Sequence, residues 1–422
     1  MTHHNPSVSY FRSFLQLASA EFLAAAIVIA FAPVIARMYA VADFGHYELY
    51  FAIATLTTSV SMFGYERSIL LENTPQGQFD GLLLSAFCLV CVTIAATIFL
   101  LVYGRNCDDP HVSSVWTWAL PSYVLLAGTY NLLSTYLTRL GNFSVLARLK
   151  IGSTSVAMIS QVGFALCGIG FIGIVISNLI SQLIVVTYLG VLCCRRVFGD
   201  NLVLNRHQVS QVAWKHWRLP ILFLPGNFMA GFTNSIPTMF FANMDINLLG
   251  YYAFTRRILG LPLNAIGSSL QRVYSNALSN EIENTGQARN VVMKSFCYYL
   301  TTGTILFIGL VLVGVPLIPY LFGSQWTPAI PYVVLFGIEF CNKFVFGGLS
   351  SLMFYGKLPK YDIIWQVLNI CSVVTCFFLA SLLELSVWET VIAYVMTSAL
   401  SYQLYGVAII WLSNRSDLLT AK

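Results

Sequence analysis

The sequence predicts an all-α, polytopic membrane protein with about twelve transmembrane helices in two six-helix bundles. Of the 422 residues, 57% are hydrophobic and only 9% are charged, which is far from the composition of soluble domains. The apolar residues fall into runs of the length that a bilayer requires, about 20 residues each. The second half of the chain also repeats the outline of the first.

The apolar runs predict twelve spans. These are expected near residues 14–36, 44–70, 82–104, 113–137, 145–167, 171–194, 219–242, 248–273, 295–320, 327–354, 361–382 and 388–412. No connecting segment exceeds a few tens of residues, so the sequence leaves no room for a soluble catalytic or nucleotide-binding domain. We therefore expect no enzyme activity and no cofactor.

The basic residues indicate the orientation. Most of the 22 lysines and arginines fall in loops on one side if both chain ends are cytoplasmic, in agreement with the positive-inside rule. This distribution explains the net charge of +5 without a nucleic-acid partner. The ten cysteines lie mostly inside spans, so we expect neither a disulfide framework nor a metal site.

The stretch Leu248–Ala277 carries Arg256 and Arg257 well inside a mostly apolar segment. On one continuous α-helix, a polar stripe would be formed by Arg257, Gly260, Asn264, Ser268 and Gln271. A cation at mid-membrane costs roughly 2.5 to 3.5 kcal/mol on the mildest scale, so by default it marks a substrate or ion path. An arginine paired to a structural carboxylate is the alternative.

Two further carboxylates lie on predicted spans. Glu21 is either a proton-titrating group or a structural group near the cytoplasmic face. Glu66 and Arg67 lie near the cytoplasmic end of the span predicted at 44–70, one side of which is polar along its whole length. They are either part of a gate or site, or an interfacial ion pair. Glu21 and Glu66 are the candidates for ion coupling.

A possible ion pair lies on the span predicted at 327–354. Glu339 and Lys343 have the i,i+4 spacing that allows a carboxylate to pair with an ammonium on one helix, here near mid-membrane. We interpret them first as a structural pair and second as cavity residues.

The chain divides into an N-terminal bundle, residues 1–205, and a C-terminal bundle, residues 206–422. Asp43–Ile53 resembles Ile246–Ile258, with Gly45-x-Tyr47 aligned to Gly250-x-Tyr252. Because each six-helix bundle runs from inside to outside and back, we expect the two bundles to be related by an axis along the membrane normal. The substrate path is expected between them.

Several stretches resemble the Wzx-type polysaccharide flippases of the multidrug/oligosaccharidyl-lipid/polysaccharide exporter superfamily. They are RMYAVADFGHYELY and GYERSILL, LPGNFMAGF, LGYYAFTRRILGLPLNAIGSSLQRVY, and LFGSQWTPAIPYVVL with GKLPKY. The resemblance covers nearly the whole chain, and the order and spacing of the stretches are more specific than any one of them. Arg256 and Arg257 match the position where the family usually has Gln-Arg.

The helix near residue 60 departs from the family pattern. Relatives commonly read Arg-Tyr-Glu where this chain reads Gly64-Tyr65-Glu66-Arg67. The arginine is displaced by three positions, almost one helical turn, which on a continuous helix leaves it on a similar face.

The resemblance implies a fold similar to that of the MATE exporters, in the bacterial inner membrane. It also implies ion-coupled alternating access that moves an undecaprenyl-pyrophosphate-linked oligosaccharide, for lipopolysaccharide O-antigen or capsule, to the periplasmic leaflet. Membrane lipids and the polysaccharide polymerase machinery are further expected partners. The substrate-binding residues expected on this basis are Arg256, Arg257, Asn264, Arg67, Tyr65 and Asn227.

Three other functions compete with this one. A multidrug or cation exporter of the same fold should favour acidic cavity residues, which Arg256 and Arg257 oppose. A membrane polymerase or ligase should have a sizeable periplasmic loop, which the sequence does not show. A lipid II type flippase of the same superfamily is disfavoured only weakly.

Overall fold

The computed structural model describes residues 6–103, 110–199, 205–285, 287–355 and 358–415. Within these ranges the chain is all-α, which confirms the predicted fold class. The chain forms two compact units, one with residues up to Phe31 and Tyr47–Ser235, the other with Ala32–His46 and the residues from Ile236 onward. The bundle boundary expected between residues 205 and 206 stays a prediction.

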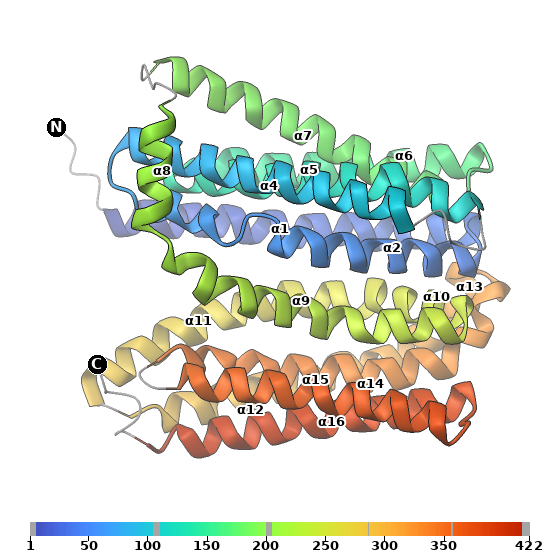
Figure 1. The fold of residues 1–422 in the computed structure, drawn as a ribbon. Helices are drawn as coiled ribbons and strands as arrows, with labels where there is room; N and C mark the ends of the chain where they lie inside the picture. Colours follow the sequence, from blue (N-terminus) through green and yellow to red (C-terminus); the bar gives the residue numbers. More distant parts are fainter. Residues whose placement is uncertain (1–5, 104–109, 200–204, 286, 356–357, 416–422) are drawn as a thin grey trace. The chain divides into compact units, whose positions relative to one another are not determined.

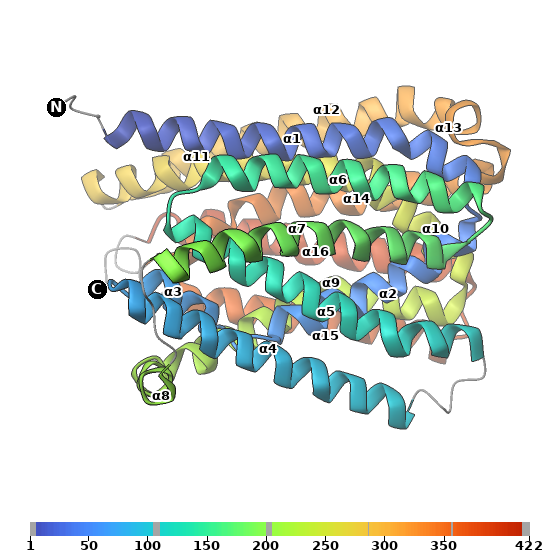
Figure 2. The same cartoon turned by 90° about the horizontal axis from the view of Figure 1, so that it is seen from above.

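The first unit is built from long helices that run alongside one another, with α8 lying across their ends (Figure 1). Its core includes Tyr50, Leu89, Val124 and Tyr136, all of them almost fully buried. The view from above shows α8 end-on beside α4 (Figure 2). The helices of the first unit are α1 (Pro6–Met38), α2 (Val41–Val60), η1 (Tyr65–Arg67), α3 (Ser68–Leu71), α4 (Pro75–Tyr103), α5 (Pro110–Arg139), α6 (Phe143–Leu166), α7 (Phe171–Gly199), α8 (Arg206–Lys215) and α9 (Arg218–Met244). Parts of α1, α2 and α9 belong to the second unit.

The second unit is again a set of long helices, interrupted by short π- and 3₁₀-helical turns. They are α10 (Ile246–Thr255), η3 (Arg256–Gly260), α11 (Leu261–Thr285), α12 (Arg289–Gly309), η4 (Leu310–Gly314), α13 (Val315–Phe322), η5 (Ser324–Ala329), α14 (Ile330–Gly347), η6 (Gly348–Phe354), α15 (Pro359–Leu382) and α16 (Val387–Leu412). Asp245 caps α10 by accepting a hydrogen bond from the Asn247 amide, and Ser386 forms a capping box with Glu389 at the start of α16.

Long helices lie at all twelve predicted spans. Eight of them, among the described residues, are long and apolar enough to cross a membrane. The others are α2, α5, α9 and the combined α10, η3 and α11. The first and last of these four contain the polar faces noted in the sequence, which lower their hydropathy. A polar face on a membrane helix is stable against protein or water and not against lipid.

The span expected at 44–70 is not one helix, which corrects the prediction. α2 ends at Val60, and the chain then turns through Phe63 and Gly64, whose φ angles are 54° and 79°. Gly64 packs so closely on α9 that a Cβ there would lie 3.0 Å from the Cβ of Phe223. Because the helix is broken, the one-turn argument that kept Arg67 on the same face no longer holds.

The helix expected at 248–273 is also interrupted. Arg256–Gly260 forms a π-helical turn between α10 and α11. A π-turn uses i→i+5 hydrogen bonds and shifts the register of all later side chains. Pro262 follows the turn and has no N–H group to donate to the carbonyl four residues earlier, so one hydrogen bond of a regular α-helix is missing there. The continuous polar stripe expected from α-helical spacing is therefore wrong at this point, and both arginines lie inside the irregular turn.

The repeat seen in the sequence corresponds to a reciprocal helix contact within the second unit. A Cβ on Gly45 of α2 would lie 2.1 Å from the carbonyl oxygen of Ile246, and a Cβ on Gly250 of α10 would lie 2.3 Å from that of Val41. Gly45 aligns with Gly250 in the repeat, and Val41 aligns with Ile246. Two small residues thus let the two helices approach to backbone contact.

Candidate functional site

The arginine pair lies beside buried aromatic side chains. Arg256 and Arg257 are half-buried, and the Arg257 guanidinium carbon lies 5.8 Å from the centre of the Phe44 ring. A guanidinium over an aromatic face is attracted by the negative charge of the ring surface. The π-turn therefore places Arg257 next to an aromatic wall, with Arg256 beside it in the chain.

That wall is a cluster of four buried rings, Tyr39, Phe44, Phe254 and Trp326. Phe44 meets Trp326 edge-on at 5.2 Å between ring centres and Tyr39 at 6.4 Å. Trp326 stacks on Phe254 at 4.1 Å. Sequence reasoning assigned no role to these residues, although Phe44 and Trp326 lie in two of the stretches that carry the family resemblance.

Hydrogen bonds join the end of α1 to η5 and to the end of α13, beside this cluster of rings. Trp326 Nε1 donates to the Ala36 carbonyl at 2.8 Å, and Gln325 Nε2 donates to the same carbonyl at 2.6 Å. In return, Arg37 Nε donates to the Leu321 carbonyl at 2.8 Å, and its Nη2 donates to the Tyr320 carbonyl. Side chains of α1 and η5 thus satisfy free carbonyl groups at the ends of α13 and α1.

Beyond the π-turn, the residues of the expected stripe separate. Asn264 is exposed, whereas Gln271 turns toward η6 and donates to Ser351 Oγ at 3.4 Å. Asn264 is therefore the stripe residue in α11 that is open to a ligand or solvent, and Gln271 is a packing residue.

The other expected substrate residues belong to the first unit. Tyr65 and Glu66 are half-buried in η1, and the exposed Arg67 lies with its guanidinium carbon 3.8 Å from the centre of the Phe223 ring. Asn227, half-buried, follows on α9 one turn after Phe223. Glu21 lies half-buried on α1. The six expected substrate residues are thus divided between the two units.

Glu339 and Lys343 form a close pair on α14. Lys343 Nζ lies 2.5 Å from Glu339 Oε1, and the Tyr394 hydroxyl donates to the same oxygen at 2.5 Å. Glu339 is fully buried, and Lys343 also lies 5.9 Å from the ring of Tyr402. A buried charge without its partner is costly, so loss of either member should destabilise α14 and its contact with α16 through Tyr394.

A second ionic cluster, which sequence reasoning missed, joins α8 to the end of α3. Glu72 Oε1 accepts from Lys215 Nζ at 2.6 Å and lies 2.8 Å from His216 Nε2. Burial alone would raise the pKa of the Glu72 carboxyl, but hydrogen bonds from Lys215 and His216, together with their charges, hold that pKa below its ordinary value. No periodicity in the sequence connects these residues, because they lie far apart along the chain.

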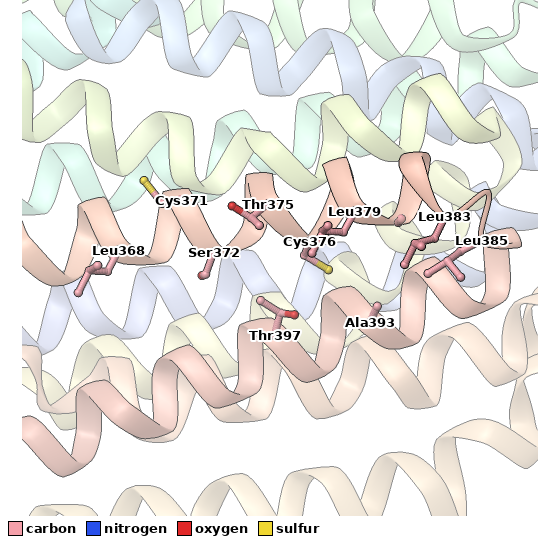
Figure 3. A pocket seen from close by; sticks show the side chains of 11 residues that line it. Leu368, Cys371, Ser372, Thr375, Cys376, Leu379, Leu383, Leu385, Ala393 and Thr397 are labelled. Carbon is pink, nitrogen blue, oxygen red and sulfur yellow. The ribbon is translucent and has the colours of Figure 1, made fainter.

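An apolar groove of about 640 Å³ runs between α15 and α16 (Figure 3). Thr397 and Ala393 of α16 face Ser372, Thr375 and Cys376 of α15 across it. It carries no charged side chain, so it does not suit a phosphate. Across the part of the chain that the structure describes, no group of three or more His, Cys, Asp or Glu side chains could hold a metal ion.

Comparison with known proteins decides the family. The model of the family described as polysaccharide biosynthesis protein matches residues 34–331. The chain belongs to the polysaccharide biosynthesis protein family. The matched residues include the cluster of four buried rings, both arginines and η5. A search of curated proteins finds no match.

Solved structures show the same fold at low sequence identity. The lipid II flippase MurJ, in an inward closed conformation, is 11% identical with a TM-score of 0.68 over 96% of this chain and 90% of that one. A MOP superfamily transporter from Pyrococcus furiosus is 11% identical with a TM-score of 0.59 over 97% and 96%. An inward-facing multidrug resistance MATE family transporter is 11% identical with a TM-score of 0.58 over 96% of both chains. This family member is therefore a multi-pass membrane protein with the MATE-like fold.

Proposed function

We propose that the protein is a flippase that moves an undecaprenyl-pyrophosphate-linked oligosaccharide repeat unit, for O-antigen or capsule, from the cytoplasmic to the periplasmic leaflet. The observation that carries this proposal is the pair Arg256 and Arg257, placed in a π-turn beside buried aromatic rings within a membrane helix. Membership of the polysaccharide biosynthesis family supports it.

The chemistry of the arginine pair suits a diphosphate. A guanidinium presents several N–H donors in a planar fork that matches phosphate oxygens, and it stays charged in a low-dielectric environment. Two adjacent cations provide a site for the multiple negative charges of a pyrophosphate. The polyprenyl tail is apolar and can remain in the bilayer throughout.

The test is a set of substitutions at the pair. Arg257→Lys keeps the charge but loses the fork, so we expect weak transport, and Arg257→Ala should abolish it. Arg256→Ala should be milder. Arg289→Ala, which removes an exposed arginine at the start of α12, is the matched control and should transport normally.

The readout is surface polysaccharide in a flippase-deficient strain, normalised to the amount of protein in the membrane. Full activity of Arg257→Ala would remove the substrate-site role. Loss of the Arg257→Ala protein from the membrane would instead show a role in folding and would equally overturn the proposal.

Two transporters of the same fold are the alternatives, a multidrug or cation exporter and a lipid II type flippase. The lipid-linked intermediate that accumulates when the gene is deleted separates them. An oligosaccharide on undecaprenyl pyrophosphate supports the proposal, lipid II indicates the second alternative, and sensitivity to cationic drugs without an accumulating lipid indicates the first.

Ion coupling through Glu66 or Glu21 also stays a prediction. A coupling carboxylate must change its charge during each transport cycle. The Gln variant of the residue that couples transport to protons, and the double variant, should therefore lose the dependence of transport on pH. Normal transport by all three variants across a pH series would exclude proton coupling through these groups.

The orientation in a bacterial inner membrane, with both termini cytoplasmic, is part of the same proposal; the chain ends lie outside the described residues. Reporter fusions after Arg105 and Phe322 should read periplasmic, and fusions after Arg206 and Lys357 should read cytoplasmic. A cytoplasmic signal at either Arg105 or Phe322 would contradict the predicted topology. Association with the polysaccharide polymerase machinery is a further part of this proposal.

A further inference from the structure

The first unit contains a polar cavity that the proposed diphosphate site does not use. It has a volume of about 390 Å³ and lies between the end of α2, the turn η1 with α3, and α5. Glu66 lines it, together with hydroxyl and amide side chains from α2 and α5. The cavity belongs to one compact unit and is formed by that unit alone.

Four of the five hydroxyl groups of the wall donate their protons to backbone carbonyls, and Ser134 is the exception. Thr58 donates to the Ala54 carbonyl at 2.7 Å and Ser59 to the Leu56 carbonyl at 2.7 Å. On α5, Thr135 and Thr138 donate in the same way to the carbonyls four residues earlier, at 2.8 and 2.7 Å. A hydroxyl has one proton and two lone pairs, so each of these groups offers only lone pairs to a ligand.

Glu66 adds a further acceptor. Its Oε2 atom is buried and has no hydrogen-bond partner among the described residues. A carboxyl group keeps lone pairs that accept hydrogen bonds in either protonation state, and a buried acceptor left without a donor is costly. Apart from the Asn131 amide and the Ser134 hydroxyl, the polar wall therefore offers acceptors. Such a wall is complementary to a ligand that brings several O–H donors.

The size of the cavity argues against a bare cation. A volume of about 390 Å³ is roughly ten times the 30 Å³ that one water molecule occupies in the liquid, and it falls in the range of small-molecule pockets. A cation such as Ca²⁺ needs six to eight oxygens at about 2.3–2.6 Å. One carboxylate in a wide cavity does not provide such a cage.

We propose that this cavity is a saccharide-binding site, in which Glu66 and the lone pairs of Thr58 and Thr135 accept hydrogen bonds from hydroxyls of a pyranose ring. Met62 and Leu70, which also line the cavity, provide apolar contact for a ring face. The inference rests on the proposed function for the presence of a sugar, because the transported lipid carries an oligosaccharide. It does not depend on the arginine pair.

The experiment measures saturation transfer by NMR from the full-length protein in nanodiscs to free sugars at millimolar concentration. The probes are glucose, galactose, mannose, rhamnose and N-acetylglucosamine, with cyclohexanol as a ring that has a single hydroxyl. We expect transfer to at least one pyranose above that to cyclohexanol. Glu66→Gln and Thr135→Val should each reduce it about fivefold or more, since each removes an acceptor oxygen.

Thr187→Val is the matched control. Thr187 on α7 also donates to the carbonyl four residues earlier, but it does not line the cavity, so this variant should bind like the wild type. Thermal unfolding of each variant shows whether it is folded. Thr135→Val keeps the shape of the side chain and therefore tests the site even if Glu66→Gln proves unstable.

Three results would overturn the proposal. One is that no sugar exceeds cyclohexanol, and another is that both cavity variants bind like Thr187→Val. The third is that Na⁺ or K⁺, in place of choline, stabilises the wild type and not Glu66→Gln, which would assign the cavity to a cation. Arg257→Ala should keep its sugar signal, so failure of the diphosphate site and failure of this site are distinguishable.

Discussion

The reciprocal glycine contact between α2 and α10 leads to a quantitative prediction. Gly45→Ala would place a Cβ 2.1 Å from the Ile246 carbonyl oxygen, and Gly250→Ala would place one 2.3 Å from the Val41 carbonyl oxygen. Both obstructing atoms belong to the backbone, so no side-chain rotation can relieve the overlap. Ordinary van der Waals contact begins near 3.4 Å, and the two helices must therefore separate by roughly 1 Å.

The expected cost follows from two opposing effects. Overpacking a close contact costs about 1–3 kcal/mol. We expect a cost at the upper end of this range, because the backbone on both sides of the contact is rigid. Alanine is about 1 kcal/mol better than glycine in a helix interior. The net destabilisation is therefore about 1–2 kcal/mol for each substitution. The double variant should cost less than the sum, because one separation of the helices relieves both overlaps.

Thermal unfolding in detergent measures this, and two other glycines serve as controls. Gly152 in α6 and Gly190 in α7 have no other group within 4 Å of the position that a Cβ would occupy. Gly152→Ala and Gly190→Ala should leave the melting temperature unchanged or raise it. Gly45→Ala and Gly250→Ala should lower it by a few degrees. Melting of Gly45→Ala at or above the controls would refute the close-contact argument.

Two further predictions concern the ionic clusters. Glu72→Gln should loosen α8 by about 1–3 kcal/mol at neutral pH, seen as faster hydrogen exchange there. The pKa of Glu72 is lowered on folding. In the wild type, the protection of the α8 amides from exchange should therefore be complete above the ordinary glutamate pKa and should be lost as the pH falls through the lower pKa of the folded state. The variant should show no such acid transition. Protection of α8 that is equal in both proteins would contradict this. Glu339→Gln should cost about 3 kcal/mol, the lower end of the range for a broken buried pair, because it leaves the half-buried Lys343 ammonium without its counter-ion. Adding Lys343→Met should restore part of the melting temperature, and a double variant as unstable as the single one would show that the pair is not coupled.

The sequence by itself determined the features that depend on local composition. The length and polarity of the apolar runs placed the long helices, because a bilayer accepts only segments that satisfy their own backbone hydrogen bonds. Adjacent arginines inside such a run marked Arg256 and Arg257 without any structure. The alignment of Gly45 with Gly250 was also visible in the sequence, but the close backbone contact at each of these glycines was not.

The tertiary structure alone decided where helices break. No proline stands near the break after Val60. Pro262 does follow the π-turn, but Pro33 and Pro121 lie inside α1 and α5, which continue through them. A proline in the sequence therefore does not by itself predict an interruption, because the packing of neighbouring helices decides whether the freed carbonyl groups are tolerated.

Contacts between residues far apart along the chain were also beyond the sequence. Phe44 and Trp326 meet only once the corner after α1 lies against η5, and Glu66 gains its cavity only when α5 packs beside it. Helical periodicity reports which face a side chain occupies, but it contains no information on which distant helix that face will meet.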